Sequence, residues 1–285
     1  MTPTDLAPQI NPPTRLYPRR RTISWSAWIG FAGILLITLI ALLAPWLTPY
    51  DPYLRVTDAY LPPSQSHVFG TDGVGRDLLS RILVGVQSTW LASAAVIAFS
   101  LLFGTLIGAL SGAIGGKTDF LVQRVVDLFL VFPGTLIAFA MAAVLGPGLL
   151  NSIATLAIFW WPWYARISRD EIRRLRTRPH FEAARAAGVG RRRLLLVHLL
   201  PGALPSLIIA ATLDVSNMIM ALSVMSFLGL GQPAPSAELG AMTARSLDSL
   251  TVFWWIPILP ASALLLMCLF SNLAGDGLRS ALKGT

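Results

Sequence analysis

Six apolar stretches alternate with polar or basic segments along the chain. Each is long enough for an α-helix to cross the hydrocarbon core of a membrane, which takes about 20 residues. The predicted membrane-spanning helices are residues 25–46, 88–113, 120–145, 149–165, 204–231 and 252–274. Pro133 is expected to kink the third helix, because proline removes a backbone hydrogen bond. The pattern therefore predicts an all-α, polytopic membrane protein with six transmembrane helices.

The polar segments divide the chain into five parts. These are a flexible tail (1–24), the first transmembrane helix (25–47), a loop (48–87), a five-helix core (88–275) that includes a basic loop (166–203), and a polar tail (276–285). A cleaved signal peptide is the alternative for the first apolar stretch. We favour a transmembrane helix there, because the stretch is long enough to span and has no clear small-residue cleavage site.

The basic residues predict which ends of the helices face the cytoplasm. Cytoplasmic segments of membrane proteins carry an excess of lysine and arginine. With both termini placed inside, 18 of the 22 basic residues lie in the two tails, the basic loop and the turn near Gly115 with the adjoining helix start that carries Arg124. The four others are Arg55, Arg76, Arg81 and Arg245. This topology makes residues 48–87 an external loop and the basic loop a cytoplasmic one.

Composition agrees with a membrane protein and argues against catalysis. Hydrophobic residues make up 54% of the chain and charged residues 13%, whereas a soluble domain has about 25% charged residues. The net charge of +8 reflects topology rather than nucleic-acid binding, since most basic residues lie between apolar stretches. Cys268 is expected to be a buried thiol, and the three histidines are far apart. We see no metal-ligand cluster, phosphate loop or nucleophile–base pair, so we expect no catalytic residues and no metal or cofactor bound by this chain.

A short alanine-rich segment stands out within the basic loop. Pro179 suits a first helical turn, Glu182-Ala183-Ala184 favours helix, and Gly188 can take the left-handed conformation that ends one. The predicted helix has about eight residues, too few to be stable alone in water. Its thin apolar face comprises Phe181, Ala184, Ala187 and Val189. Because these side chains are mostly small, we expect the face to dock closely against a partner.

The order of residues in this segment resembles the EAA loop of ATP-binding-cassette importer permeases. In that pattern Glu-Ala-Ala is followed after three residues by glycine and after nine more by x-x-Leu-Pro, as in residues 182–201. Four further segments fit in order: FGTDGVGRDLLSR from residue 69, RVVDLFLVFPG from 124, SFLGLG from 226 and NLAGDGLR from 272. The chain thus resembles the shorter permease subunit of dipeptide, oligopeptide and nickel importers (the DppC/OppC type). The resemblance implies the type I ABC importer permease fold.

The same resemblance implies partners and a location. They are a second permease subunit of the DppB/OppB type, two ATPase domains or subunits, an external substrate-binding protein and the lipid of a bacterial plasma membrane, with no nucleic acid. ATP and magnesium would bind to the ATPase subunits. The chain departs from many relatives at Leu222, Glu238-Leu239-Gly240 and Ser280, which weakens any transfer of substrate details.

In that family the EAA loop is a cytoplasmic coupling helix seated in a groove of the ATPase subunit. Glu182 is then expected to be a polar anchor within the loop, paired with a nearby arginine. Ala183, Ala184 and Gly188 would allow close approach. Arg185 would pair with acidic residues of the ATPase, or would be an ordinary solvated arginine.

A glycine-rich part of the external loop carries four charged residues. Gly70, Gly73 and Gly75 allow tight turns, and the charged residues that can pair with one another are Asp72, Arg76, Asp77 and Arg81. One interpretation is a structural ion-pair knot. The other is direct contact of Asp72, Arg76 and Asp77 with the substrate-binding protein.

Two polar residues lie within the predicted fifth span. Asp214 and Asn217 are candidates for the substrate path, because polar groups at membrane depth are costly. Asp214 could attract the amino group of a peptide, or could have a partner within the chain. We expect import of dipeptides or oligopeptides, with nickel, opines, glutathione and haem open as alternatives. An intramembrane enzyme is a poor fit, since no second catalytic group is evident at membrane depth.

Overall fold

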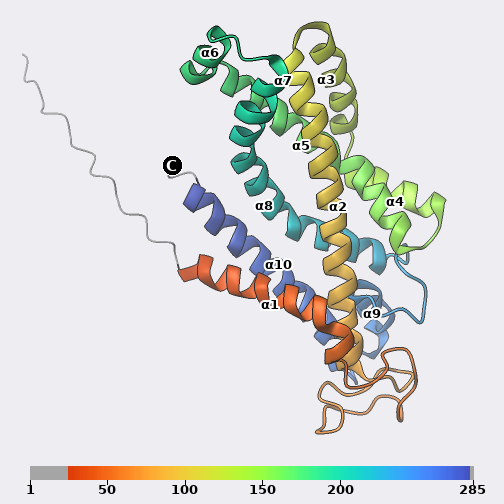
Figure 1. Ribbon diagram of the computed structural model, residues 1–285. Helices are drawn as coiled ribbons and strands as arrows, with labels where there is room; N and C mark the ends of the chain where they lie inside the picture. Colours follow the sequence, from red (N-terminus) through yellow and green to blue (C-terminus); the bar gives the residue numbers. More distant parts are fainter. Residues whose placement is uncertain (1–24, 283–285) are drawn as a thin grey trace, which may run out of the picture.

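The computed structural model describes residues 25–282, and these form a bundle of helices (Figure 1). The elements are α1 (Trp25–Leu47), α2 (Leu78–Ile114), α3 (Gly116–Val131), α4 (Gly134–Leu145), α5 (Leu149–Arg176), α6 (Pro179–Ala186), α7 (Arg191–Arg193), the π-helical η1 (Leu194–Leu199), α8 (Leu200–Phe227), α9 (Leu239–Arg245), the 3₁₀-helical η2 (Leu247–Ser249) and α10 (Trp255–Leu282). The part of the chain described contains no strand, only an isolated bridge between Thr71 and Asp77. The all-α prediction is confirmed, and the predicted flexible tail of residues 1–24 lies outside the described residues.

Four helical segments are long and apolar enough to span a membrane. They are α1, α2, the continuous helix from Arg191 to Phe227, and α10. The bent pair α3 and α4 makes a fifth if it is counted as one span. α5 holds the remaining predicted span and is not among them, because tryptophans and polar residues lower its mean hydropathy. The count of six therefore stays a prediction.

Pro133 breaks the third predicted helix rather than bending it. α3 ends at Val131, α4 begins at Gly134, and the two axes differ by 78°. Residues before a proline avoid the α conformation, and Phe132 is extended with ψ 151°. The predicted kink is confirmed, and it is a full break in the helix.

Several predicted boundaries were wrong because the helices continue beyond their apolar stretches. α2 starts at Leu78, so residues 78–87 are helix and the loop ends at Asp77. The cause is an N-cap, because the Asp77 side chain accepts the backbone N–H of Ser80. Its 37 residues extend about 55 Å, well beyond the roughly 30 Å hydrocarbon core. α10 likewise runs to Leu282, through most of the predicted polar tail.

Three other helices also extend beyond their predicted bounds. α3 begins at Gly116 instead of residue 120, and α5 continues to Arg176, beyond the predicted end at residue 165. The fifth predicted helix starts earlier, because α7, η1 and α8 follow one another from Arg191 without a break. Hydropathy marks only the part of a helix that suits lipid, whereas backbone hydrogen bonding carries each helix further.

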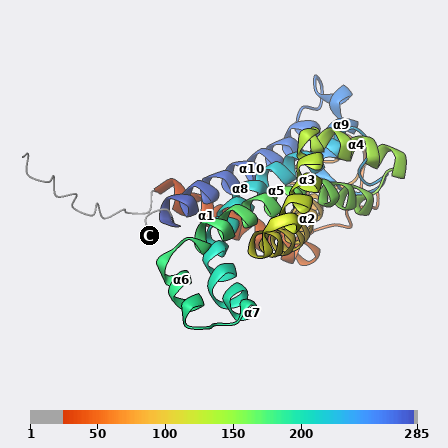
Figure 2. The same cartoon turned by 90° about the horizontal axis from the view of Figure 1, so that it is seen from above.

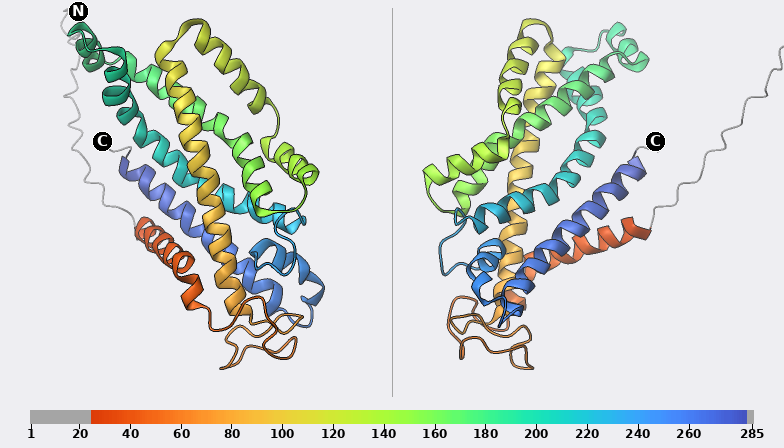
Figure 3. Two further views of the ribbon diagram at one scale, coloured as in Figure 1. Left: turned by 45° about the vertical axis from the view of Figure 1, so that its right-hand side comes forward. Right: turned by 180° about the vertical axis from the view of Figure 1, so that it is seen from behind.

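Small residues bring the long helices close together. A Cβ atom added to Gly104 would lie 2.3 Å from the carbonyl oxygen of Trp161, and one on Gly108 would lie 2.1 Å from that of Ala165. The backbones of α2 and α5 therefore touch along this stripe of glycines. α1 and α10 lie side by side in the same manner, with Gly30 against the backbone of Ala274 (Figures 1 and 3).

The bundle has two contrasting ends. One, here called the loop end, consists of residues 48–77 and 228–254. The other, the α6 end, consists of residues 166–199 and the Gly115 turn between α2 and α3. Figures 1 and 2 show α6 and α7 projecting from the body of the bundle at this end.

Candidate functional site

The short helix predicted within the basic loop is present as α6. It has eight residues, with Pro179 in its first turn and its end at Ala186. Gly188 follows with φ +78°, and the N–H of Val189 bonds back to the carbonyl of Ala184 at 3.2 Å. This is the left-handed helix end that glycine favours. The prediction of a short helix ended by Gly188 is confirmed.

The apolar face of α6 packs onto its own chain. Phe181 is buried in a cluster with Ile172 and Leu175 of α5 and with Leu194 and Leu199 of η1. Ala184 and Val189 pack against the same cluster. We expected this face to dock against a partner, and that expectation was wrong for these residues. The physical reason is that Phe181 is large and apolar, so the chain buries it itself.

The opposite face of α6 is open to solvent. Glu182, Ala183, Arg185 and Ala186 are exposed, and no heavy atom lies within 4 Å of the position a Cβ would take on Gly188. The Glu182 carboxylate forms no hydrogen bond or ion pair with any described residue, unlike the anchor we predicted. The exposed face of α6 therefore has small side chains beside the charged Glu182 and Arg185, and it has no partner among the described residues.

Ion pairs tie the base of the α6 end together. Arg169 of α5 holds both oxygens of Asp119 of α3, from Nε at 2.6 Å and from Nη2 at 2.7 Å. This hydrogen bonding raises the pKa of the Arg169 guanidinium further above its usual range. Ser111 of α2 also donates to Asp119, at 3.1 Å, and Arg176 donates to the carbonyl of Gly112 at 2.7 Å. α2, α3 and α5 are thus joined where α6 is mounted.

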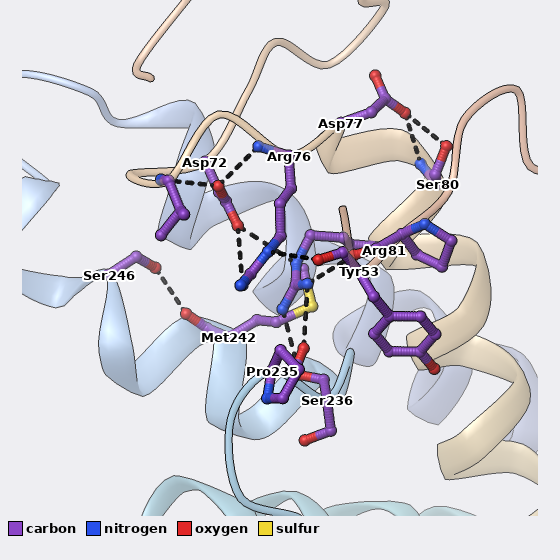
Figure 4. Close-up of polar contacts among 12 residues, drawn as sticks. Tyr53, Asp72, Arg76, Asp77, Ser80, Arg81, Pro235, Ser236, Met242 and Ser246 are labelled. Carbon is purple, nitrogen blue, oxygen red and sulfur yellow. Dashed lines mark hydrogen bonds and ion pairs between the residues drawn. The ribbon is translucent and has the colours of Figure 1, made fainter. Parts of the chain in front are cut away.

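Three of the four charged residues, Asp72, Arg76 and Arg81, form the structural ion-pair knot that was one of our two interpretations. Figure 4 shows Arg81 between the turn that carries Asp72 and the segment with Pro235 and Ser236. Its guanidinium lies 3.4 Å from Asp72 and donates to the carbonyls of Pro52 at 2.7 Å and of Pro235 and Ser236 at 3.2 Å. Asp72 in turn accepts the backbone N–H of Arg76 at 2.9 Å. Arg81 therefore joins two loops that are distant in sequence.

Asp77 is engaged within the chain as well. Besides capping α2, its carboxylate accepts the Ser80 hydroxyl at 2.7 Å and contacts Nδ1 of His67 at 2.9 Å. The charged groups of Asp72 and Asp77 therefore serve the fold. Contact of Asp72, Arg76 and Asp77 with a binding protein stays a prediction.

Sequence reasoning missed Glu238, which is buried at the loop end. Its carboxylate accepts the hydroxyl of Ser226 and the backbone N–H of Gln232, the latter at 2.8 Å. It closes the turn between α8 and α9. The available signal was an acidic residue directly before a short helix, which suggests a helix cap. The carboxylate instead accepts hydrogen bonds from residues of the preceding turn.

The two predicted path residues line a pair of adjoining cavities. One cavity, of about 360 Å³, is bordered by Asp214 and Asn217 of α8, by Trp160 and Trp163 of α5, and by the break between α3 and α4. The other, of about 400 Å³, is bordered by Asn217, Ser216 and Trp160 and by Cys268 and Asn272 of α10. The structure thus brings Asp214 and Asn217 together, beside two cavities that no residue of α6 borders.

Asp214 also has partners within the chain, as our alternative interpretation expected. The indole N–H of Trp160 donates to one carboxylate oxygen at 3.2 Å, and the side-chain amide of Asn217 donates to the other at 3.3 Å. Asp214 is 7% exposed. Both partners are neutral, so a buried acidic group lies beside a cavity without a cation from the described residues.

Comparison with known proteins gives the class to which this arrangement belongs. Residues 104–283 match the model of binding-protein-dependent transport system inner membrane components, and residues 24–63 match the N-terminal transmembrane domain of oligopeptide transport permease C. The chain belongs to this family of inner-membrane transport components. It is a multi-pass permease component of an ABC importer, and such permeases work with ATPase subunits and a substrate-binding protein.

Individual relatives narrow the comparison. The chain is 40% identical to the probable D,D-dipeptide transport system permease protein DdpC of Escherichia coli K12, over 87% of this chain and 84% of that one. It is 38% identical to the nickel transport system permease protein NikC of the same strain, over 90% and 94%. Among solved structures, the inward-facing MetNI methionine ABC transporter shares its fold, with a TM-score of 0.59 and 21% identity over 72% of this chain and 97% of that one. These relatives are transporter subunits and not enzymes.

Proposed function

We propose that this chain forms half of the translocation path of an ATP-driven importer of dipeptides or oligopeptides, and that α6 couples it to the ATPase subunits. The observation that supports the coupling role is the way α6 packs against the rest of the chain. Its apolar face is fixed to α5 and η1, while its other face is open and has small side chains. A push on the open face is transmitted directly into two long helices.

The orientation of the chain in the membrane is inferred from its charges. The α6 end carries most of the arginines of the described residues, so the positive-inside rule places it in the cytoplasm together with both termini. The loop end then faces outward, where a substrate-binding protein delivers cargo. ATP and magnesium bind to the ATPase subunits, and a second permease subunit of the DppB/OppB type completes the path.

Within this proposal each residue of the EAA segment has a role. Ala183 and Gly188 let the ATPase surface approach closely, since they are exposed and small. Ala184 fixes the helix to its own chain. Glu182 and Arg185 are exposed charges at the same surface, where they pair with groups of the ATPase.

The peptide cargo rests on the dipeptide relative and on the character of the cavities. Their walls are mainly aromatic and apolar with a few polar groups, which suits cargo of varied side chains. No group of three or more His, Cys, Asp or Glu side chains in the described residues could hold a metal ion. That observation favours a peptide over a free metal ion, and a nickel cargo is the alternative outcome of the experiment below.

The test is ATP hydrolysis by the reconstituted complex with its binding protein, stimulated by dialanine or by a nickel chelate. In Ala183→Arg a long cation stands on the open face of α6, and we expect peptide-stimulated hydrolysis to fall by more than about tenfold. Ser280→Arg places the same side chain at the exposed end of α10 and should leave stimulation within about twofold. Full stimulation in Ala183→Arg, with the complex assembled, would contradict the coupling role. Stimulation by the nickel chelate alone would replace the peptide cargo.

A further inference from the structure

The first of the two cavities has an unusual electrostatic character. Asp214 is near the midpoint of α8 and is buried at its border, yet no lysine, arginine or histidine of the described residues pairs with it. A buried charge is costly unless it is paired. Trp160 and Asn217 donate hydrogen bonds to its two oxygens, but both are neutral and bring no compensating charge.

The groups packed around Asp214 add no compensating cation. From α5, the buried hydroxyl of Tyr164 interacts electrostatically with Asp214 and is a further uncharged group. The last turn of α3, with Phe129 and Leu130, and the first turn of α4, with Gly134 and Thr135, both border the cavity. A helix C-terminus carries partial negative charge and a helix N-terminus partial positive charge, so these two ends offset each other. Among the residues that border the described cavity, Asp214 is therefore the only charged side chain.

Aromatic side chains complete the same wall. Trp160 and Trp163 border the cavity with Asp214. The faces of tryptophan rings attract organic cations, and ammonium groups in particular. The carboxylate and the indoles both favour one chemical class of ligand, a positively charged amine.

We propose that Asp214 forms a subsite in this cavity for the ammonium group of the cargo, such as the free amino terminus of a peptide. This inference rests on the proposed function, since it names what part of the peptide the permease itself recognises. The carboxylate accepts an ionic hydrogen bond from the ammonium group, and the indoles of Trp160 and Trp163 cover its charge. A transition metal fits less well, because only Asp214, Met220 and Cys268 among the residues that border the two described cavities are of the usual ligand types.

Cys268 provides a built-in reporter of this charge. It is the single cysteine of the chain, and it borders the adjoining cavity, which shares Thr135, Trp160 and Asn217 with the first. The experiment compares the rates at which a cationic and an anionic methanethiosulfonate reagent of similar size modify Cys268. The complete complex is used in lipid nanodiscs, with partner subunits free of cysteine and without the binding protein. The ratio of the two rates measures the local electrostatic potential and needs no transport.

Comparing the wild type with three variants shows whether the rate ratio depends on the charge of Asp214. In the wild type we expect the cationic reagent to react about tenfold faster than the anionic one, relative to their rates with a free thiol. Asp214→Asn keeps the shape of the side chain and should bring the ratio close to one, while Asp214→Glu should restore it. Asp248→Asn removes the same charge from an exposed position in η2 at the loop end, which borders neither cavity, and should leave the ratio unchanged. An unchanged ratio in Asp214→Asn, or an equal fall in Asp248→Asn, would overturn the proposal.

A second measurement on the wild type tests the ligand directly. Dialanine at high concentration should slow modification of Cys268, whereas N-acetyl-dialanine, which lacks the ammonium group, should not. Equal protection by both peptides, or by neither, would overturn the ammonium assignment. The two proposals can fail separately: peptide-independent ATP hydrolysis with a normal rate ratio removes the peptide cargo, while normal peptide stimulation with a ratio of one removes only the subsite.

Discussion

The loop end and the α6 end both contain glycines and charged residues, but these are packed and paired at the loop end and exposed at the α6 end. At the loop end, a Cβ on Gly75 would lie 2.1 Å from the carbonyl oxygen of Thr57, and Arg81 is surrounded by acceptors from its own chain. At the α6 end, the space around Gly188 is empty and Glu182 has no partner among the described residues. Glycine and charge complete the fold in the first case, and in the second they leave an open surface, which we propose an ATPase subunit covers.

This contrast separates stability from coupling. Interactions satisfied within the chain contribute to its folding, whereas groups left open contribute only when a partner arrives. Substitutions at the loop end should therefore alter unfolding of the permease. Substitutions on the open face of α6 that keep the backbone conformation should leave unfolding nearly unchanged.

The largest effect is expected for Arg81→Met. Without the guanidinium, the Asp72 carboxylate and three backbone carbonyls lose their shared donor in a site where the Arg81 side chain is 4% exposed. Removing one partner of a buried ion pair costs about 3–5 kcal/mol. Arg55→Met is the matched control, because its ion pair with Asp58 has an arginine side chain 64% exposed and should contribute less than about 1 kcal/mol. Thermal unfolding of the purified complex measures both, and equal midpoints for the two variants would remove the distinction between knot and surface pair.

A pair of glycines sharpens the comparison further. Gly75 and Gly188 have similar positive φ angles of +86° and +78°, so alanine carries a similar backbone strain of about 1–2 kcal/mol at either position. Gly75→Ala must also push its Cβ into the Thr57 carbonyl, which adds about 1–3 kcal/mol of overpacking. Gly188→Ala meets no neighbouring atom. Unfolding midpoints that fall equally in both variants would show that the two ends are packed alike.

A smaller effect is expected at the base of the α6 end. Asp119→Asn removes the charge from a largely buried pair with Arg169 and should destabilise the permease by about 1–2 kcal/mol. Asp170 pairs with the same arginine, but its side chain is 61% exposed. Asp170→Asn should therefore change the unfolding free energy by less than about 0.5 kcal/mol. A loss in Asp170→Asn as large as that in Asp119→Asn would indicate that the base is not held by the α3–α5 contact.

The smallest change in stability is expected for Glu182→Gln. The carboxylate makes no hydrogen bond or ion pair with any described residue, so the unfolding free energy should stay within about 0.5 kcal/mol of the wild type. The same thermal unfolding assay is the measurement. A loss above about 1 kcal/mol would reveal an anchor within the loop, as first expected from the sequence.

Local signals account for what could be predicted from the sequence. Pro179, the alanines and Gly188 lie within ten residues and specify α6 almost to its ends. Asp77 and Ser80 are likewise close in sequence and mark the start of α2. We placed that start too late because we used only the apolar stretch to locate the helix. In both cases the hydrogen bonds join near neighbours, so the residue types alone carry the information.

Contacts between distant segments could not be predicted in the same way. Arg81 meets Pro235 and Ser236 across more than 150 residues, and Asp214 meets Trp160 across 54. Such pairings depend on how the helices pack, which the pattern of one chain does not specify. The sequence therefore marked Asp214 as unusual without indicating which side chains surround it.

The central claim is that the open face of α6 is completed by an ATPase subunit while the loop end is complete in itself. Hydrogen–deuterium exchange measures this most directly, on the permease pair in nanodiscs with and without the ATPase subunits. The amides of residues 179–190 should exchange at least about tenfold more slowly when the ATPases are bound, and those of residues 48–77 should be unchanged. Equal exchange of residues 179–190 in the two states, with the ATPases shown to be bound, would contradict the claim.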